Sequence, residues 1–336
     1  MKTTLEDIAL ASGVSKATVS YVLNNKRSSL GLSEQTIAKV LNVSRELNYR
    51  PDLVAVALSE LKNVPLSLLI LSPWLHSQFS DFMVQVSRVL EANTLPMRLK
   101  LTYELYQSGN LRKALRPARS QKFNAVIVIG TSDEDDVFLR KNREKFPNAV
   151  LLNREVDGYA GVRGNDYEAS AELARRISAA GYYERYVIFN SGNISDCELK
   201  RIDGFRDVLE HAGVQDIRIF EGSSTVPPTD YPEQLYTRFF KEKTLYFIPQ
   251  YYQAACFLKY LQMRKIAVPE SAGVAAYDSH SLLTHFLSPS LTTVDPKIGE
   301  MTSAALQLAK GIKEGKQVSR EVIRSAFVPG ESAVYK

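Results

Sequence analysis

The first residues of this chain include side chains that could read the edges of DNA bases. Lys16, Ala17 and Tyr21 fall on one face of the segment SKATVSYVLN. In a helix that enters the major groove, residues near its N-terminus reach the base edges, so we expect these three to carry sequence specificity. Neighbouring hydroxyl and amide groups are suited to phosphate oxygens, and we expect them to position the helix. They are Thr4, Ser15, Thr18, Ser20 and Asn24.

Two short helices must hold these side chains in place. Thr4 can cap a first helix whose third position is Asp7, a weaker form of the capping box. Gly13 ends that helix where a positive φ is needed, and Ser15 can cap a second one. The small Ala9 lets the two helices cross closely. The pattern predicts a helix-turn-helix, with a purely structural helical hairpin as the alternative.

A third helix closes a headpiece over residues 1–50. Ser33 can cap it, and Pro51 prevents it from continuing. Apolar residues recur at helical spacing in the second and third helices: Val19, Val22, Leu23, Ile37, Val40, Leu41 and Leu47. Residues 52–61 are apolar enough for a further short helix, but ten residues are marginal without a partner.

Composition excludes several classes of protein. The 336 residues exceed one compact core and indicate two or three domains. The net charge is only +5, and residues 1–50 hold seven basic and four acidic side chains, so phosphate contacts must be placed individually. The chain has neither a secretory segment nor an apolar run of membrane-spanning length, so we expect a cytoplasmic protein. Cys197 and Cys256 lack metal-site spacing, and we expect no metal and no cofactor.

From Pro65 onward, short apolar runs alternate with amphipathic stretches. Eight runs are expected to be strands: residues 66–71, 97–103, 125–130, 149–153, 186–190, 217–222, 244–249 and 273–278. Continuous apolar strands separated by helices predict parallel sheets covered on both faces. Eight such units exceed one usual sheet, so two doubly wound lobes are expected, with a ligand site beyond the carboxyl ends of the strands.

Over essentially its whole length the chain resembles the lactose and purine repressor (LacI/GalR) family. The resemblance rests on TLEDIALASGVSKATVSYVLN, SEQTIAKVLNVSRELNYRP, VAVALSE, KRIDGFRDVLEHAG and the last strand VIRSAFVP. It implies a helix-turn-helix headpiece and a core of two lobes like a periplasmic binding protein. The core would span 63–336, with crossings near residues 162, 291 and 322. The first lobe would then comprise about 63–162 and 292–322, and the second about 163–291 and 323–336.

In that family the segment matching residues 51–62 is a hinge helix that pairs with its dimer mate over the operator centre. Leu58 matches the residue that wedges between the central base pairs. A helical linker packed on the large domain is the alternative.

The resemblance also implies an effector site between the lobes. The matching residues include two cations, a carboxylate, an amide and two aromatic rings: Phe79, Arg154, Arg201, Tyr231, Gln250 and Asp278. This set suits a polyhydroxylated or heterocyclic ligand. Arg201 and Asp278 could equally form a structural ion pair, and Phe79 could belong to the core. Tyr251 and Ser279 depart from the family's usual Asp or Asn, and Pro296 replaces a polar residue, so the effector's identity stays open.

Catalytic motifs give no support to an enzyme. GIKEGKQ is one residue too short for a P-loop, GxSxG is absent, and the four histidines are scattered. We expect a homodimeric repressor that binds pseudo-palindromic double-stranded operator DNA, has no membrane partner and responds to a small carbohydrate. The alternatives are a regulator of the same family that answers a phosphocarrier protein and a sugar-binding protein.

Overall fold

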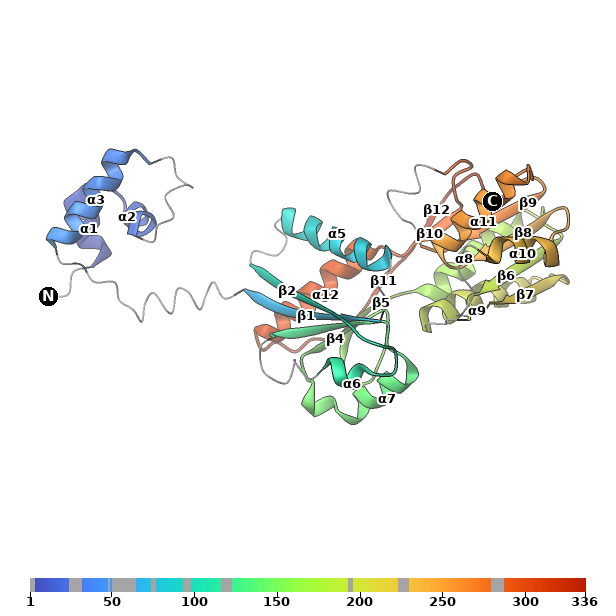
Figure 1. Ribbon diagram of the computed structural model, residues 1–336, viewed down its shortest axis with the longest axis horizontal. Coiled ribbons are helices and arrows are strands. Elements are labelled where there is room, and N and C mark those ends of the chain that lie inside the picture. The colour runs from blue at the N-terminus through green and yellow to red at the C-terminus, as the bar shows by residue number, and fades with distance from the viewer. Residues whose placement is uncertain are drawn as a thin grey trace. The chain divides into compact units, whose positions relative to one another are not determined.

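The computed structural model describes residues 4–23, 32–47, 49, 65–73, 77–92, 98–115, 123–192, 196–222, 230–278 and 287–336 (Figure 1). The chain divides into two compact units, Met1–Val64 and Pro65–Lys336. Asn24, Leu58 and the expected hinge helix lie outside the described residues. Phe79 lies in helix α5, Ser77–Glu91, but its side chain is outside the description.

The first unit contains the three expected helices: α1 (Leu5–Ser12), α2 (Lys16–Leu23) and α3 (Glu34–Glu46). The capping box is present, since the Thr4 backbone N–H donates to Asp7 at 2.8 Å and the Asp7 N–H donates to the Thr4 hydroxyl at 3.3 Å. Gly13 ends α1 with a φ of 68°. The Ser33 hydroxyl accepts from the Thr36 N–H at 3.2 Å and caps α3.

A small apolar core joins these helices. Ile8, Val19, Val22 and Val40 are fully buried, and Leu23, Ile37 and Leu41 pack against them. Lys16, Ala17 and Tyr21 are exposed on α2. The apolar stripe therefore points inward and leaves the opposite face of α2 open.

In the second unit, the first lobe is built on a six-stranded parallel sheet with the order β11-β5-β4-β3-β1-β2. The strands are β1 (Leu66–Ser72), β2 (Leu99–Leu105), β3 (Ala125–Ile129), β4 (Ala149–Leu152), β5 (Ala160–Gly164) and β11 (Arg320–Ile323). Helices α5 and α12 (Ile298–Lys313) cover one face. Helices α6 (Leu111–Ala114) and α7 (Asp133–Lys141) pack on the opposite face, and the short 3-10 turn η3 (Arg143–Lys145) comes after α7. Helices therefore cover both faces of the sheet, which is doubly wound.

The second lobe has a four-stranded parallel sheet with the order β7-β6-β8-β9. Its strands are β6 (Arg185–Asn190), β7 (Ile217–Glu221), β8 (Thr244–Ile248) and β9 (Ala272–Ala276). Helices α8 (Asp166–Ala179) and α9 (Asp196–His211) cover one face. Helices α10 (Tyr231–Phe239) and α11 (Tyr251–Met263) cover the other.

The last strand expected from the sequence, VIRSAFVP, is two strands in different sheets. Strand β11 joins the first lobe, whereas β12 (Ala326–Val328) pairs with β10 (Thr293–Asp295). Ser325 separates them, because its N–H donates to the Asn165 side chain at 2.7 Å and its hydroxyl bonds to Tyr277 at 3.1 Å. Since β10 also contacts α8, the chain enters the first lobe after Asp295, a few residues beyond the expected crossing near 291.

Candidate functional site

The exposed face of α2 carries the three predicted base-reading side chains. The Ser15 hydroxyl caps this helix by accepting from the Thr18 N–H at 3.1 Å, and the two hydroxyls lie 2.9 Å apart. The Lys16 ammonium donates to the Glu6 carboxylate of α1 at 3.1 Å, and both side chains remain largely exposed. Glu6 was not among the predicted site residues. The Ser15 cap therefore fixes the start of α2, where the predicted base-reading residues Lys16 and Ala17 lie.

The remaining described residues that were predicted to contact DNA are Thr4, at the start of α1, and Ser20, on α2. Thr4 takes part in the capping box, with its hydroxyl donating to Asp7 at 2.8 Å. Ser20 is half-buried on α2. All the described members of the predicted set therefore lie on α2, in its cap or at the start of α1.

A buried arginine of the second lobe contacts residues that follow three different strands. Arg201 of α9 is 5% exposed, and its Nε donates to Asp166 at 2.8 Å. Its Nη1 donates to Asp278 at 3.2 Å and to the carbonyl of Pro249 at 3.2 Å. Asp166 follows β5, while Pro249 and Asp278 follow β8 and β9. The structure thus brings the predicted cation and carboxylate together at the carboxyl ends of the strands.

The charges in this cluster stabilise one another. Burial disfavours a charged guanidinium, but Asp278 and Asp166 together hold the pKa of Arg201 well above its ordinary value. Burial raises the pKa of the Asp278 carboxyl, and Arg201 opposes that rise. The guanidinium also lies 3.9 Å from the centre of the Tyr277 ring. Arg201 is therefore a fixed positive charge whose side chain has little freedom to move.

Gln250 belongs to an adjoining polar group. Its side-chain N–H donates to Glu198 at 2.7 Å and to Ser191 at 3.4 Å. Glu198 is 3% exposed, and burial raises its pKa despite the hydrogen bonds from Gln250 and Ser191. Neither Glu198 nor Asp166 was among the predicted residues. Glu198 precedes Arg201 by three residues in a predicted helix, so the spacing could have indicated a shared face.

Tyr231 lies in the hydrophobic core at the start of α10. It is 4% exposed, and its ring meets Phe189 and Phe220 edge-on at centroid distances of 5.1 and 5.9 Å. Of the two predicted wall residues, Tyr231 therefore packs on rings of the second lobe, and Phe79 is described only by its backbone.

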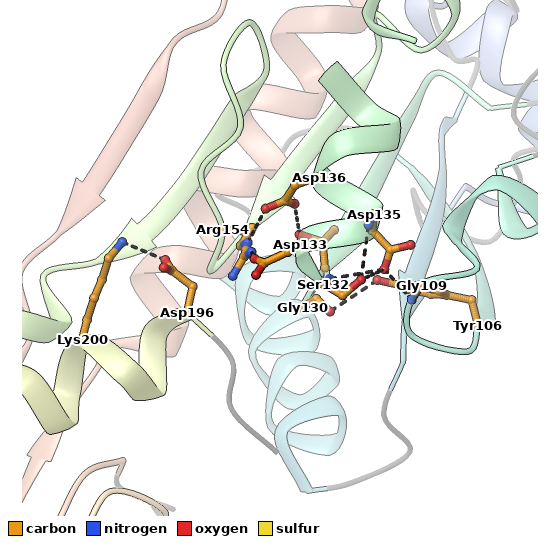
Figure 2. Close-up of polar contacts among 11 residues, drawn as sticks. Tyr106, Gly109, Gly130, Ser132, Asp133, Asp135, Asp136, Arg154, Asp196 and Lys200 are labelled. Carbon is orange, nitrogen blue, oxygen red and sulfur yellow. Dashed lines mark hydrogen bonds and ion pairs between the residues drawn. The ribbon is translucent and has the colours of Figure 1, made fainter. Parts of the chain in front are cut away.

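In the first lobe, Arg154 follows β4 and is held by acidic side chains of α7. Figure 2 shows its guanidinium between Asp133 and Asp136, with a distance of 2.7 Å from Nε to Asp136. Asp136 also accepts from the Thr131 hydroxyl at 2.5 Å. Burial opposes the charge, but these carboxylates and Asp196 at the start of α9 raise the pKa of Arg154.

The turn before α7 is fixed by a third aspartate of this helix, Asp135. Asp135 forms a capping box with Ser132 and accepts from the N–H groups of Gly109 and Leu111, each at 3.0 Å. The Tyr106 hydroxyl donates to the carbonyl of Gly130 at 3.3 Å (Figure 2). These contacts tie the strand ends of β2 and β3 to α7, which in turn orients Arg154.

Across the described residues, no helix is long and apolar enough to cross a membrane. The same residues contain no group of three or more His, Cys, Asp or Glu side chains that could hold a metal ion.

Comparisons with known protein families match both units. Residues 4–52 match the family described as "Bacterial regulatory proteins, lacI family". Residues 174–333 match the "Periplasmic binding protein-like domain". The match to residues 4–52 covers the three helices α1 to α3. The match to residues 174–333 covers most of the second lobe, together with α12 and β11 of the first lobe.

Similar proteins extend over nearly the whole chain. The HTH-type transcriptional regulator DegA of Bacillus subtilis is 26% identical, with 96% of this chain and 95% of that protein covered. GalS of Salmonella typhimurium, another HTH-type transcriptional regulator, is 26% identical with 91% and 88% covered. The lac repressor dimer bound to operator and an anti-inducer has the same fold, with a TM-score of 0.68, 17% identity and 99% of each chain covered. The CelR–cellobiose complex gives a TM-score of 0.66 at 18% identity, covering 99% of this chain and 100% of that one.

Proposed function

Since the chain belongs to the LacI family of bacterial transcriptional regulators, we propose that it is a repressor whose affinity for operator DNA changes when a small carbohydrate binds between its two lobes. Members of this family are regulators rather than enzymes. A homodimer would present two headpieces to a pseudo-palindromic site, because a two-fold protein matches a two-fold sequence. Because the proposed partner is chromosomal DNA, we expect the protein to lie in the cytoplasm.

The exposed face of α2 supports the proposed contact with DNA. Its apolar side is committed to the headpiece core, so Lys16, Ala17 and Tyr21 remain available for base edges. We assign phosphate contacts to the surrounding polar groups Thr4, Ser15, Thr18, Ser20 and Asn24. Leu58 is proposed as the wedge at the operator centre, on a hinge helix within residues 51–62. The structurally similar lac repressor was solved on its operator.

The observation that carries the proposed effector site is the ion pair between Arg201 and Asp278. Parallel sheets bind ligands beyond the carboxyl ends of their strands, which is where this pair lies. Gln250 from the same strand ends and Arg154 from the first lobe complete the proposed polar contacts, with Phe79 and Tyr231 as proposed walls. Similar structures contain cellobiose or ribose. If the pair were only structural, removing it would weaken folding but leave ligand responses unchanged.

The test begins with a thermal-shift screen of sugars, because a ligand at 100 times its dissociation constant stabilises the protein by about 2.7 kcal/mol. Operator affinity is then measured with and without the ligand found, for the wild type and Asp278→Asn. We expect the variant to bind operator as the unliganded protein does and to lose the response, because a ligand shifts the protein only through contacts that differ between its states. An unchanged response would remove Asp278 from the site. A response only to a phosphorylated carrier protein would replace the carbohydrate effector.

A further inference from the structure

An acidic side chain of α1 lies beside the first base-reading residue of α2. The Lys16 ammonium and the Glu6 carboxylate are 3.1 Å apart, and their side chains are 58% and 70% exposed. Glu6 belongs to the first turn of α1 and Lys16 opens α2, so this contact joins the two helices of the helix-turn-helix. Because both groups are open to solvent, a base edge that reaches the Lys16 ammonium also comes within reach of Glu6.

The fold of the headpiece makes little use of this carboxylate. The capping box of α1 is formed by Thr4 and Asp7, and its core contacts come from Ile8 and Ala9. An exposed ion pair adds little to stability. A carboxylate at a surface that contacts DNA also repels phosphates and so lowers affinity for every sequence. Recognition of a base explains the position of Glu6 better than stability does.

The Lys16–Glu6 pair has the spacing of the polar groups on one base pair. In the major groove, a G·C pair presents the guanine O6 acceptor next to the cytosine N4 donor. A Watson–Crick hydrogen bond joins these two atoms, so they lie about 3 Å apart. Lys16 offers donors and Glu6 offers acceptors at nearly the same separation, 3.1 Å. An ammonium has three donors and a carboxylate about four acceptor positions, so each group can bond to the other and to a base.

We propose that Glu6 is a specificity-determining residue that reads one G·C base pair together with Lys16. Lys16 donates to guanine O6 and N7, and Glu6 accepts from cytosine N4. The inference rests on the proposed function and adds a residue of α1 to the base contacts assigned to α2.

This geometry ranks the four base pairs at that position. A T·A pair presents an acceptor and a donor in the same order, thymine O4 and adenine N6, but places the thymine methyl group where guanine has N7. The C·G and A·T pairs reverse the order, so that a donor faces Lys16 and an acceptor faces Glu6. We therefore expect G·C to bind best, T·A second and the two reversed pairs last.

The experiment selects binding sites for the intact protein from random duplex DNA. Affinities are then measured for all four base pairs at the position whose preference Lys16→Ala relaxes. Glu6→Gln keeps the length of the side chain and one acceptor but adds an N–H donor, so it can face either orientation of a base pair. Glu34→Gln is the matched control, because Glu34 is exposed in the first turn of α3 as Glu6 is in that of α1.

We expect Glu6→Gln to reduce the preference for G·C over C·G by about tenfold at this position and to leave other positions unchanged. The double variant with Lys16→Ala should lose less than the product of the two single losses, since both groups act on one base pair. Glu34→Gln should change no preference.

Three results would overturn the inference while leaving DNA binding in place. They are an unchanged preference in Glu6→Gln, a change at a base pair other than the one that Lys16 reads, and an equal gain in affinity on every sequence. The equal gain would mean that the carboxylate acts only by repelling phosphates. If the wild type selects no sequence, the proposed function and the inference both fail.

Discussion

At the scale of single residues, the pairing of Lys16 with Glu6 bears on how the headpiece reads DNA. An exposed ion pair contributes about 0–1 kcal/mol to stability, so its effect on folding is small. The 3.1 Å contact directs the Lys16 ammonium toward Glu6 of α1. It also offsets part of the charge that would attract phosphates without regard to sequence.

Lys16→Ala should therefore alter specificity more than general DNA affinity. We expect a loss of about 1–3 kcal/mol on the preferred operator, confined to one or two base positions. Binding to a library of operator variants measures this. Lys39→Ala on α3 removes the same charge from another exposed headpiece position and serves as the control. A uniform loss over all sequences for Lys16→Ala would make it a phosphate contact.

Local residue contacts could be predicted from the sequence, but partners distant along the chain could not. The Thr4 cap, the left-handed Gly13 and the Ser33 cap depend on neighbours within a few positions, and all three are confirmed. Asp166 lies 35 residues before Arg201, and the sequence contains no local signal for their pairing. The sequence alone therefore could not predict which carboxylates pair with the predicted cations, because the fold brings these residues together.

At the scale of elements, the close approach of α8 and α9 positions Arg201. A Cβ on Gly204 would lie 2.2 Å from the Tyr167 carbonyl oxygen of α8, too close for any other residue without movement of the helices. The Ser170 hydroxyl donates to the Arg201 carbonyl at 2.6 Å across the same contact. The glycine thus sets the helix separation, and through it the depth at which the guanidinium is buried.

Gly204→Ala should separate these helices and destabilise the second lobe by about 3 kcal/mol, the upper end for overpacking. Gly213→Ala is the comparison. It has φ of +74° but open space around its Cβ, so only backbone strain of about 1 kcal/mol is expected. Denaturant unfolding measures both changes. Equal losses for the two variants would show that the helix contact tolerates a methyl group.

Strand prediction failed at a segment that passes from one sheet to another. The segment VIRSAFVP has the composition of one strand, yet hydrogen bonds to Ser325 divide it between β11 and β12. The eight strands expected from apolar runs were found, with ends shifted by up to two residues, because burial on both faces leaves a strong pattern. Strands β5 and β10 were not among those eight.

At the scale of the whole molecule, the proposed signal from the effector site to the DNA passes through residues 51–62, which carry the proposed wedge Leu58. We expect Leu58→Ala to leave the headpiece folded but to reduce operator affinity and DNA bending, since the wedge compensates for unstacking the central base step. A circular-permutation gel assay measures the bend. Leu61→Ala removes the same side chain elsewhere in the segment and should leave the bend unchanged. If Leu58→Ala bends DNA as the wild type does, the wedge is another residue.

The return of the chain to the first lobe affects how the protein can fold during synthesis. Met301, Ala305 and Leu306 of α12 fill the core on one face of the first sheet, and β11 adds its edge strand next to β5. The ribosome makes these residues only after all four strands of the second parallel sheet. A nascent chain must therefore expose the apolar face of its first sheet while later residues emerge, which favours chaperone binding at that face. The core of the first lobe is therefore completed only when α12 and β11 have been made, and not when strands β1 to β5 have emerged.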